Sequence, residues 1–153
     1  DTRKTTPNLR FLEKWAVRLG GCYNYRDGLY DRIMIKDNHV DAAGSVSGAI
    51  KRVHHFLEEN KMQLPMTVEV RNLAELEEVL ETGNVDRVML DNFELPILKE
   101  AVAHVGDRCE TEASGGVNLQ TIRDIAKTGV NFISVGALTH SATSLDLSLK
   151  VMK

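Results

Sequence analysis

The sequence predicts an α/β fold in which parallel strands alternate with helices and curve into an open barrel of the TIM type. Three observations lead to this prediction. Short apolar or β-branched runs recur along the chain, a helical pattern follows each of them, and polar residues stand where the runs end. Strands that alternate with helices in this way form a parallel sheet that helices cover.

The predicted elements follow one another regularly. The runs expected to form strands are residues 33–35, 67–70, 87–90, 109–113 and 132–135. The helical patterns, in which apolar residues recur three or four apart, are 9–19, 46–60, 73–82, 95–105 and 119–128. Gly83, Gly106 and Gly129 follow three of these helices and can end them in the left-handed conformation. Asn72 and Asn118 are placed to cap the helices that come next.

The positions of the polar residues favour a barrel over a doubly wound sheet. Functional groups stand at or just after the ends of successive strands: Lys36, Glu69, Asp91, Ser114 with Gly115 and Gly116, and Gly136 with His140. In a barrel the loops after the strands ring one mouth, whereas a doubly wound sheet gathers such groups at one crevice. Five strands are too few to close a barrel of about 250 residues. Residues 1–153 are therefore expected to form one incomplete barrel domain that other sequence or other chains complete.

The charge distribution suggests a small anionic partner. The net charge of −3 and the pI near 6.0 lack the broad basic field of a nucleic-acid or membrane-surface binder. Residues 1–36 nevertheless hold eight Lys/Arg against four Asp/Glu, which concentrates positive charge in the first loops. No apolar run approaches the roughly 20 residues of a membrane span. With only two cysteines, a soluble cytoplasmic protein is expected.

Four cations are expected to meet at the barrel mouth. Arg3 and Lys4 lie in the opening Asp-Thr-Arg-Lys-Thr motif, Arg26 follows Tyr25, and Lys36 begins a Lys-Asp-Asn-His motif. Guanidinium groups bind carboxylates with two prongs and lysine supplies a compact charge, so the set suits a di- or polyanion. The alternative is that each is an ordinary solvated surface charge.

Two glycine-containing loops predict a phosphate site. Ser114, Gly115 and Gly116 lie between a predicted strand and a predicted helix, where backbone N–H groups can approach an oxygen-rich ligand. Gly136 and His140 follow the next strand, and adjacent late loops form the usual phosphate site of phosphate-binding barrels. The simpler interpretation of the glycine pair is a tight turn.

Two carboxylates, Glu69 and Asp91, occupy strand ends where apolar residues would have extended the core. Carboxylates that face a phosphate site can hydrogen-bond ribose hydroxyls, bind Mg²⁺ directly or through water, or stabilise a cationic sugar. A structural ion pair with Lys36 or an arginine is the alternative.

Taken together, these motifs resemble the quinolinate phosphoribosyltransferase family along essentially the whole chain. The resemblance implies a seven-stranded open α/β barrel, with an N-terminal α/β sandwich domain that is absent here. It implies a glycosyltransferase (pentosyltransferase) that transfers phosphoribosyl from 5-phosphoribosyl-1-pyrophosphate to quinolinate, with decarboxylation, to give nicotinate mononucleotide in NAD biosynthesis. It also implies Mg²⁺ and a homodimer or higher homo-oligomer. The fragment alone is expected to be weak or inactive.

By the same resemblance, Arg3, Tyr25, Arg26 and Lys36 hold quinolinate. The phosphoribosyl donor is held by Lys4, Glu69, Asp91, Ser114, Gly115, Gly116, Gly136 and His140. Lys36, Glu69 and Asp91 are the expected catalytic residues, and Glu69 and Asp91 the metal-binding ones.

Tyr25 departs from the family pattern, in which a histidine usually precedes the arginine. Tyrosine donates a hydrogen bond but carries no positive charge at neutral pH. Two alternatives therefore stay open. One is a paralogous phosphoribosyltransferase for nicotinate or another anionic ring, and the other is a non-catalytic barrel fragment.

Overall fold

The strands form a single parallel sheet in the computed structural model, which describes residues 1–152. The strands are β1 (Ile33–Ile35), β2 (Met66–Val70), β3 (Arg87–Asp91), β4 (Glu110–Ser114) and β5 (Phe132–Ile133). They lie in the order β1-β2-β3-β4-β5, so each strand pairs with the next one along the chain. A doubly wound sheet reverses its order at a switch point. The sequential order therefore confirms the predicted barrel-type arrangement.

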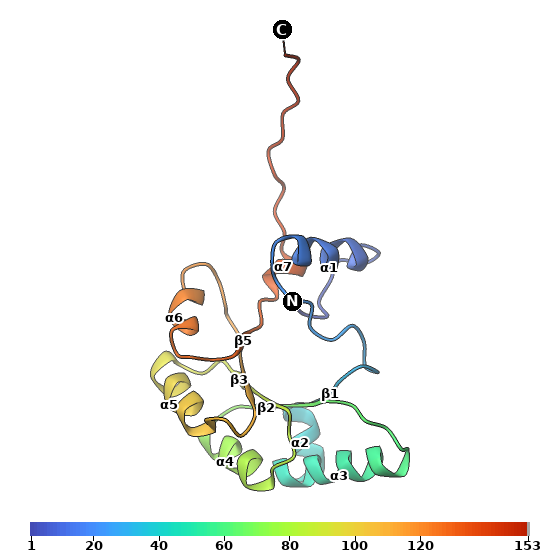
Figure 1. Ribbon diagram of the computed structural model, residues 1–153, viewed down its shortest axis with the longest axis vertical. Helices are drawn as coiled ribbons and strands as arrows, with labels where there is room; N and C mark the ends of the chain where they lie inside the picture. The colour runs from blue at the N-terminus through green and yellow to red at the C-terminus, as the bar shows by residue number, and fades with distance from the viewer. Residues whose placement is uncertain (153) are drawn as a thin grey trace.

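The helices lie on both sides of this sheet. They are α1 (Arg10–Leu19), α2 (Asp37–Ala43), α3 (Val46–Glu59), α4 (Leu73–Thr82), α5 (Leu95–Val105), α6 (Ile122–Ala126) and α7 (Ala137–His140). Figure 1 shows α2 to α6 in an arc along one face of the sheet, with α1 and α7 together across from it. The sequence did not predict α2 or α7.

The apolar core fills the space between the sheet and the arc of helices. Alternate strand residues enter it, among them Val68, Val88 and Leu90, and they pack with helix residues such as Ile50 and Leu76. Neighbouring residues of a strand point to opposite faces. The intervening positions therefore face the inside of the curved sheet, and most of them are polar: Thr67, Glu69, Arg87, Asp91, Glu112 and Ser114. The same strands thus build the core and a polar interior.

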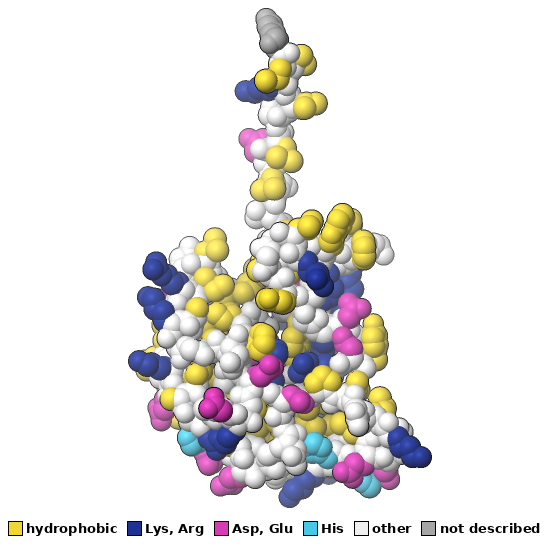
Figure 2. All heavy atoms as spheres, viewed as in Figure 1, with side chains coloured by type: hydrophobic (Ala, Val, Ile, Leu, Met, Phe, Trp, Pro, Cys, Tyr) yellow, Lys and Arg dark blue, Asp and Glu magenta, His cyan; other side chains and the backbone are white. Residues whose placement is uncertain are grey.

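The first residues of the chain contact the segment around α7, which follows the last strand, so the chain forms a ring although the sheet itself is open. The Thr139 hydroxyl donates a hydrogen bond of 2.8 Å to the Lys4 carbonyl, across 135 residues of sequence. The carboxylate of Asp1 accepts from the Tyr25 backbone N–H at 2.6 Å and pairs with Lys14 Nζ at 3.1 Å. Beyond α7, residues 141–152 extend away from the body (Figures 1 and 2). Leu145 and other apolar side chains of this extension are exposed.

The residues at the helix ends confirm part of what the sequence predicted about helix caps and helix stops. Gly83, Gly106 and Gly129 have positive φ values of 69°, 55° and 88°, which favour glycine. Gly83 and Gly106 nevertheless have ψ values of −168° and −131°, so they do not end their helices in the predicted left-handed conformation. Asn72 caps α4 by accepting from the Glu75 N–H at 2.9 Å. The predicted helix 119–128 is shorter in the structure, because the Asn118 side chain accepts from the backbone N–H groups of residues 120 and 121 and holds a turn there. None of the helices among residues 1–152 is long and apolar enough to cross a membrane.

Candidate active site

Lys36 and Glu69 face each other at the ends of β1 and β2. Lys36 directly follows β1, and its backbone N–H donates to His39 Nδ1 at 2.9 Å, which fixes the passage from strand into α2. Its Nζ lies 3.4 Å from Glu69 Oε2. The ion pair that the sequence left open as an alternative is therefore present. The pair lies at the strand ends, where the sequence also predicted Lys36 and Glu69 to line the barrel mouth.

Burial disfavours the charged form of Glu69. Burial raises the pKa of the Glu69 carboxyl above its ordinary range, the neighbouring Lys36 acts in the opposite direction, and Asp91 raises it further. In the strand register Glu69 lies opposite Met89, two residues before Asp91 on the same face, so the two carboxylates of β2 and β3 are neighbours. The carboxylates thus share one region of the mouth.

Asp91 and Ser114 form a second bonded pair, on β3 and β4. They stand opposite each other in the strand register, and Ser114 Oγ donates to Asp91 Oδ1 at 2.6 Å. Asn92, which the sequence did not single out, donates from Nδ2 to the other carboxylate oxygen at 2.7 Å. Its backbone N–H also donates to the Ser114 carbonyl at 2.9 Å. Both oxygens of Asp91 are thus held in place.

The glycines that follow Ser114 adopt backbone conformations that suit glycine. Gly115 and Gly116 have φ values of 90° and 58°. A Cβ at Gly115 would lie 2.2 Å from Asn92 Oδ1, whereas one at Gly116 would meet nothing within 4 Å. Gly115 therefore packs against the Asp91 network, while Gly116 borders open space. The expected helix N-terminus is displaced, because α6 begins only at Ile122.

The second glycine loop follows β5 and reaches the start of the chain. Gly136 directly precedes α7 as its N-cap, and a Cβ there would lie 2.7 Å from His140 Nε2. Thr139 connects this loop to the backbone of Lys4, as described above. The loop thus brings Gly136, His140 and the opening motif together, although they come from opposite ends of the sequence.

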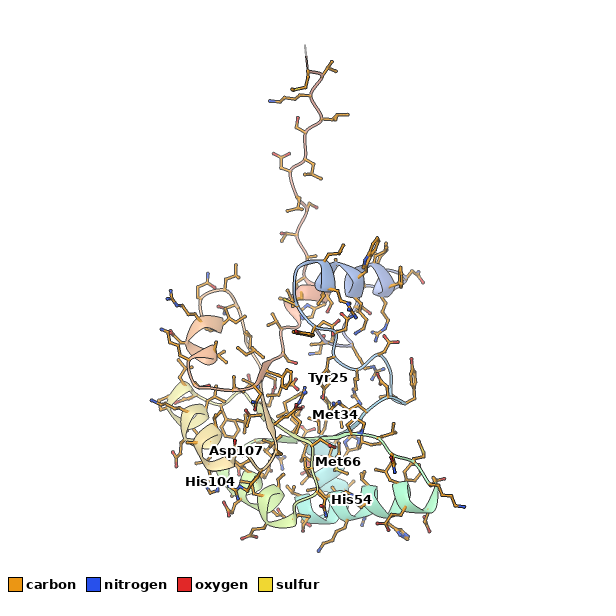
Figure 3. All side chains as sticks on the ribbon, in the orientation of Figure 1. Tyr25, Met34, His54, Met66, His104 and Asp107 are labelled. Atoms are coloured by element: carbon orange, nitrogen blue, oxygen red, sulfur yellow. The ribbon has the colours of Figure 1, made fainter. Side chains whose placement is uncertain are left out.

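The two arginines of the predicted anion site differ in burial: Arg26 is partly buried and Arg3 is exposed. Arg26 Nη1 donates to the Arg32 carbonyl at 3.2 Å, and its Nη2 lies 3.5 Å from Met34 Sδ. Burial and the nearby charge of Arg3 lower the pKa of the Arg26 guanidinium. The Tyr25 hydroxyl shares a 2.8 Å hydrogen bond with Thr67 Oγ1. Figure 3 labels Tyr25 and Met34 near each other in the middle of the molecule.

A buried ion pair in the barrel interior was missed by the sequence reasoning. The Arg87 guanidinium donates to Glu112 Oε2 at 2.9 Å and to Glu110 Oε2 at 2.7 Å, and its Cζ lies 3.7 Å from the Phe132 ring centre. Glu112 is 1% exposed and also accepts from Ser134 Oγ. The available signal was a pair of opposite charges at inward positions of adjacent strands.

The fold and the site together define a class, that of parallel α/β barrel proteins whose strand ends present cations, carboxylates and glycine loops at one mouth. The chain belongs to a particular family within that class. The family model described as quinolinate phosphoribosyl transferase, C-terminal domain, matches residues 1–150.

Individual relatives agree with this assignment. Quinolinate phosphoribosyltransferase [decarboxylating] 2a, mitochondrial, of Nicotiana tabacum is 50% identical over 165 residues, which cover 99% of this chain and 47% of that protein. A probable nicotinate-nucleotide pyrophosphorylase [carboxylating] of Bacillus subtilis is 45% identical, over 99% of this chain and 51% of that protein. The crystal structure of NadC from Streptococcus pyogenes superimposes with a TM-score of 0.89 at 45% identity, over 99% of this chain and 52% of that one. The chain spans about half the length of the relatives it matches.

Proposed function

We propose that the protein to which this chain belongs transfers phosphoribosyl from 5-phosphoribosyl-1-pyrophosphate to quinolinate and releases pyrophosphate and CO2. The product is nicotinate mononucleotide, a precursor in NAD biosynthesis. The observation that carries the proposal is the gathering of Lys36–Glu69 and Asp91–Ser114 on neighbouring strand ends beside Gly115. The names of the tobacco and Bacillus relatives support this activity.

The two substrates divide the site between a basic part and an amide-rich part. Arg3, Arg26 and Lys36 are proposed to hold the two carboxylates of quinolinate, because guanidinium and ammonium groups suit a dianion. Tyr25 is proposed to lie beside them in the quinolinate site. The phosphoribosyl donor is proposed to contact Lys4, Glu69, Asp91, Ser114, Gly115, Gly116, Gly136 and His140. Asn92 joins this second set as the residue that orients Asp91.

The chemistry follows from where charge develops. The bond between C1 of the ribose and the pyrophosphate oxygen breaks, and the pyridine nitrogen forms a bond to C1 from the opposite face. Glu69 and Asp91 stabilise the oxocarbenium-like centre, while the arginines hold the ring nitrogen in line. The pyridinium then stabilises the carbanion left when the C2 carboxylate departs as CO2, and a proton from solvent replaces it.

Magnesium is part of the proposal. No group of three His, Cys, Asp or Glu side chains that could hold a metal occurs among residues 1–152. The carboxylates of Glu69 and Asp91 already accept bonds from Lys36, Ser114 and Asn92. Oxygen ligands suit Mg²⁺, so Glu69 and Asp91 are the residues that would hold it, directly or through water. Bound Mg²⁺ would neutralise charge on the leaving pyrophosphate.

Assembly and location are proposed on the family resemblance. A homodimer or higher oligomer, completed by an N-terminal α/β sandwich domain, would close the pocket. The cytoplasmic location stays a prediction, since the name of the tobacco relative places that protein in mitochondria.

Release of ¹⁴CO2 from carboxyl-labelled quinolinate tests the proposal. The full-length dimeric protein should release it only when phosphoribosyl pyrophosphate and Mg²⁺ are present, and residues 1–153 alone should be weak or inactive. Robust turnover by the isolated chain would contradict the need for a longer chain.

A second candidate substrate is favoured by Tyr25, which lacks the charge of the usual histidine. Assays with nicotinate in place of quinolinate distinguish a paralogous enzyme. Calorimetric titration with phosphoribosyl pyrophosphate and Mg²⁺ distinguishes a non-catalytic fragment, which should show no saturable binding.

A further inference from the structure

Arg32 directs a guanidinium into the barrel interior without a carboxylate partner. It directly precedes β1, and the alternation of a strand places it on the same face as Met34 and Lys36. Its Nη1 donates to Thr67 Oγ1 at 3.2 Å. Among residues 1–152, no carboxylate lies within ion-pair distance of Arg32. Most of its donors are therefore available to a ligand.

Tyr25, Thr67 and Arg32 form one cluster. The Tyr25 hydroxyl and Arg32 Nη1 both bond the hydroxyl oxygen of Thr67, at 2.8 and 3.2 Å. Arg32 Cζ also lies 5.7 Å from the centre of the Tyr25 ring, and Arg87 Cζ lies at the same distance. The two arginines differ in their surroundings. Arg87 is neutralised by two glutamates, whereas Arg32 keeps its positive charge uncompensated.

The uncompensated charge extends beyond Arg32. Arg3 and Arg26 likewise have no ion-pair partner within residues 1–152, and Arg3 and Arg32 both act electrostatically on the Arg26 guanidinium. Arg26 and Arg32 are partly buried, whereas Arg3 is exposed. Partly buried charges of one sign are costly unless a counter-charge joins them. Arg26 donates to the Arg32 carbonyl, so these two partly buried guanidiniums belong to neighbouring residues of the interior, where they suit an anionic ligand.

We propose that Arg32 is a further substrate-binding residue, whose guanidinium binds a ring carboxylate beside Tyr25 and supplies the positive charge that a neutral tyrosine cannot. Tyr25 and Thr67 act as positioning residues that hold this guanidinium. The inference rests on the proposed function and adds one residue to its quinolinate site.

Two substitutions in the full-length protein test the proposal. Arg32→Met removes the guanidinium, and Arg32→Gln removes the charge but keeps a donor for Thr67. Both should raise KM for quinolinate about 10- to 100-fold, the range expected for losing a hydrogen bond to a charged group, with KM for phosphoribosyl pyrophosphate changed less than about twofold. Arg123→Met, on the exposed surface of α6, is the matched control and should leave both values unchanged.

A rescue experiment separates charge from structure. Adding Tyr25→His to Arg32→Met should restore quinolinate binding below about pH 6.5, where histidine is protonated, and not above it. An equal rise of both KM values in Arg32→Met and Arg32→Gln would show a structural role and overturn the proposal, as would unchanged KM values. If the wild-type protein neither binds nor converts quinolinate, the proposed function fails as well. If wild type and Arg32→Met convert it equally, only the role of Arg32 fails.

Discussion

Replacing Gly115 by alanine should damage both stability and donor binding, for two reasons visible in the structure. The backbone there has a φ of 90°, and a left-handed conformation costs an L-residue about 1–2 kcal/mol. The new Cβ would also lie 2.2 Å from Asn92 Oδ1, so the Asn92 amide must move and lose its 2.7 Å bond to Asp91. That bond is solvent-exposed, so its loss costs about 0.5–1.5 kcal/mol, the net contribution of a typical hydrogen bond. The expected destabilisation is therefore about 1.5–3.5 kcal/mol.

Gly116→Ala is the matched control. Its φ of 58° imposes a similar backbone cost, but a Cβ there meets nothing within 4 Å. It should destabilise by only about 1–2 kcal/mol, so the difference between the two variants isolates the contact with Asn92.

Urea denaturation of the full-length variants measures both free energies of unfolding, and steady-state kinetics measures KM for phosphoribosyl pyrophosphate. Gly115→Ala should raise that KM at least tenfold, because Asp91 loses the amide that orients it. Equal destabilisation by the two alanines would refute the role assigned to Asn92.

Two further predictions concern charged groups of the interior. Arg87→Met leaves Glu112 as a buried uncompensated charge and should cost about 3–5 kcal/mol in urea unfolding, and adding Glu112→Gln should recover most of the loss. No recovery in the double variant would contradict the ion-pair account. The pKa of Glu69 is raised, so folding favours its neutral carboxyl. The stability that Glu69 contributes is therefore fully present below about pH 4, the ordinary pKa of a glutamate, and is lost as pH rises through the raised pKa. Glutamine stays neutral at every pH, so thermal melts should show Glu69→Gln to be more stable than wild type at pH 7 and equally stable near pH 4. A variant less stable than wild type at pH 7 would show that the ion pair with Lys36 outweighs the desolvation of Glu69.

Most of the sheet could be predicted because local sequence determines it. The apolar runs that predict strands have buried alternate residues, such as Val68 and Leu90, and the glycines after the helices have the positive φ that favours glycine. α2 was missed because it is short and begins inside the polar Lys-Asp-Asn-His motif, so it lacks a long run of apolar residues at helical spacing. α6 was predicted too long because its apolar spacing does not show that the Asn118 side chain holds a turn ahead of it.

The site was predictable at the strand ends and not in the interior. Lys36, Glu69, Asp91 and Ser114 stand where runs of apolar residues stop, and parallel strands bring their ends to one edge. The partners of Arg87 depend on register and side-chain reach across strands, as in the pairing of Arg87 with Glu110. The same holds for Arg32, which approaches Thr67 only once β1 and β2 are aligned. Charge alone could not show which arginines are neutralised.

The hydrogen bond between Thr139 and Lys4 bears on the order in which the protein acquires its binding mouth. Each strand pairs with its neighbour in sequence, so the sheet can grow by local steps, whereas this contact joins residues 135 apart. Joining distant segments carries the larger entropic cost and slows folding. The opening motif and the last glycine loop therefore become neighbours only when the ring closes. A molecule whose sheet is complete but whose ends are apart would therefore lack the side of the mouth that Lys4 and Gly136 form.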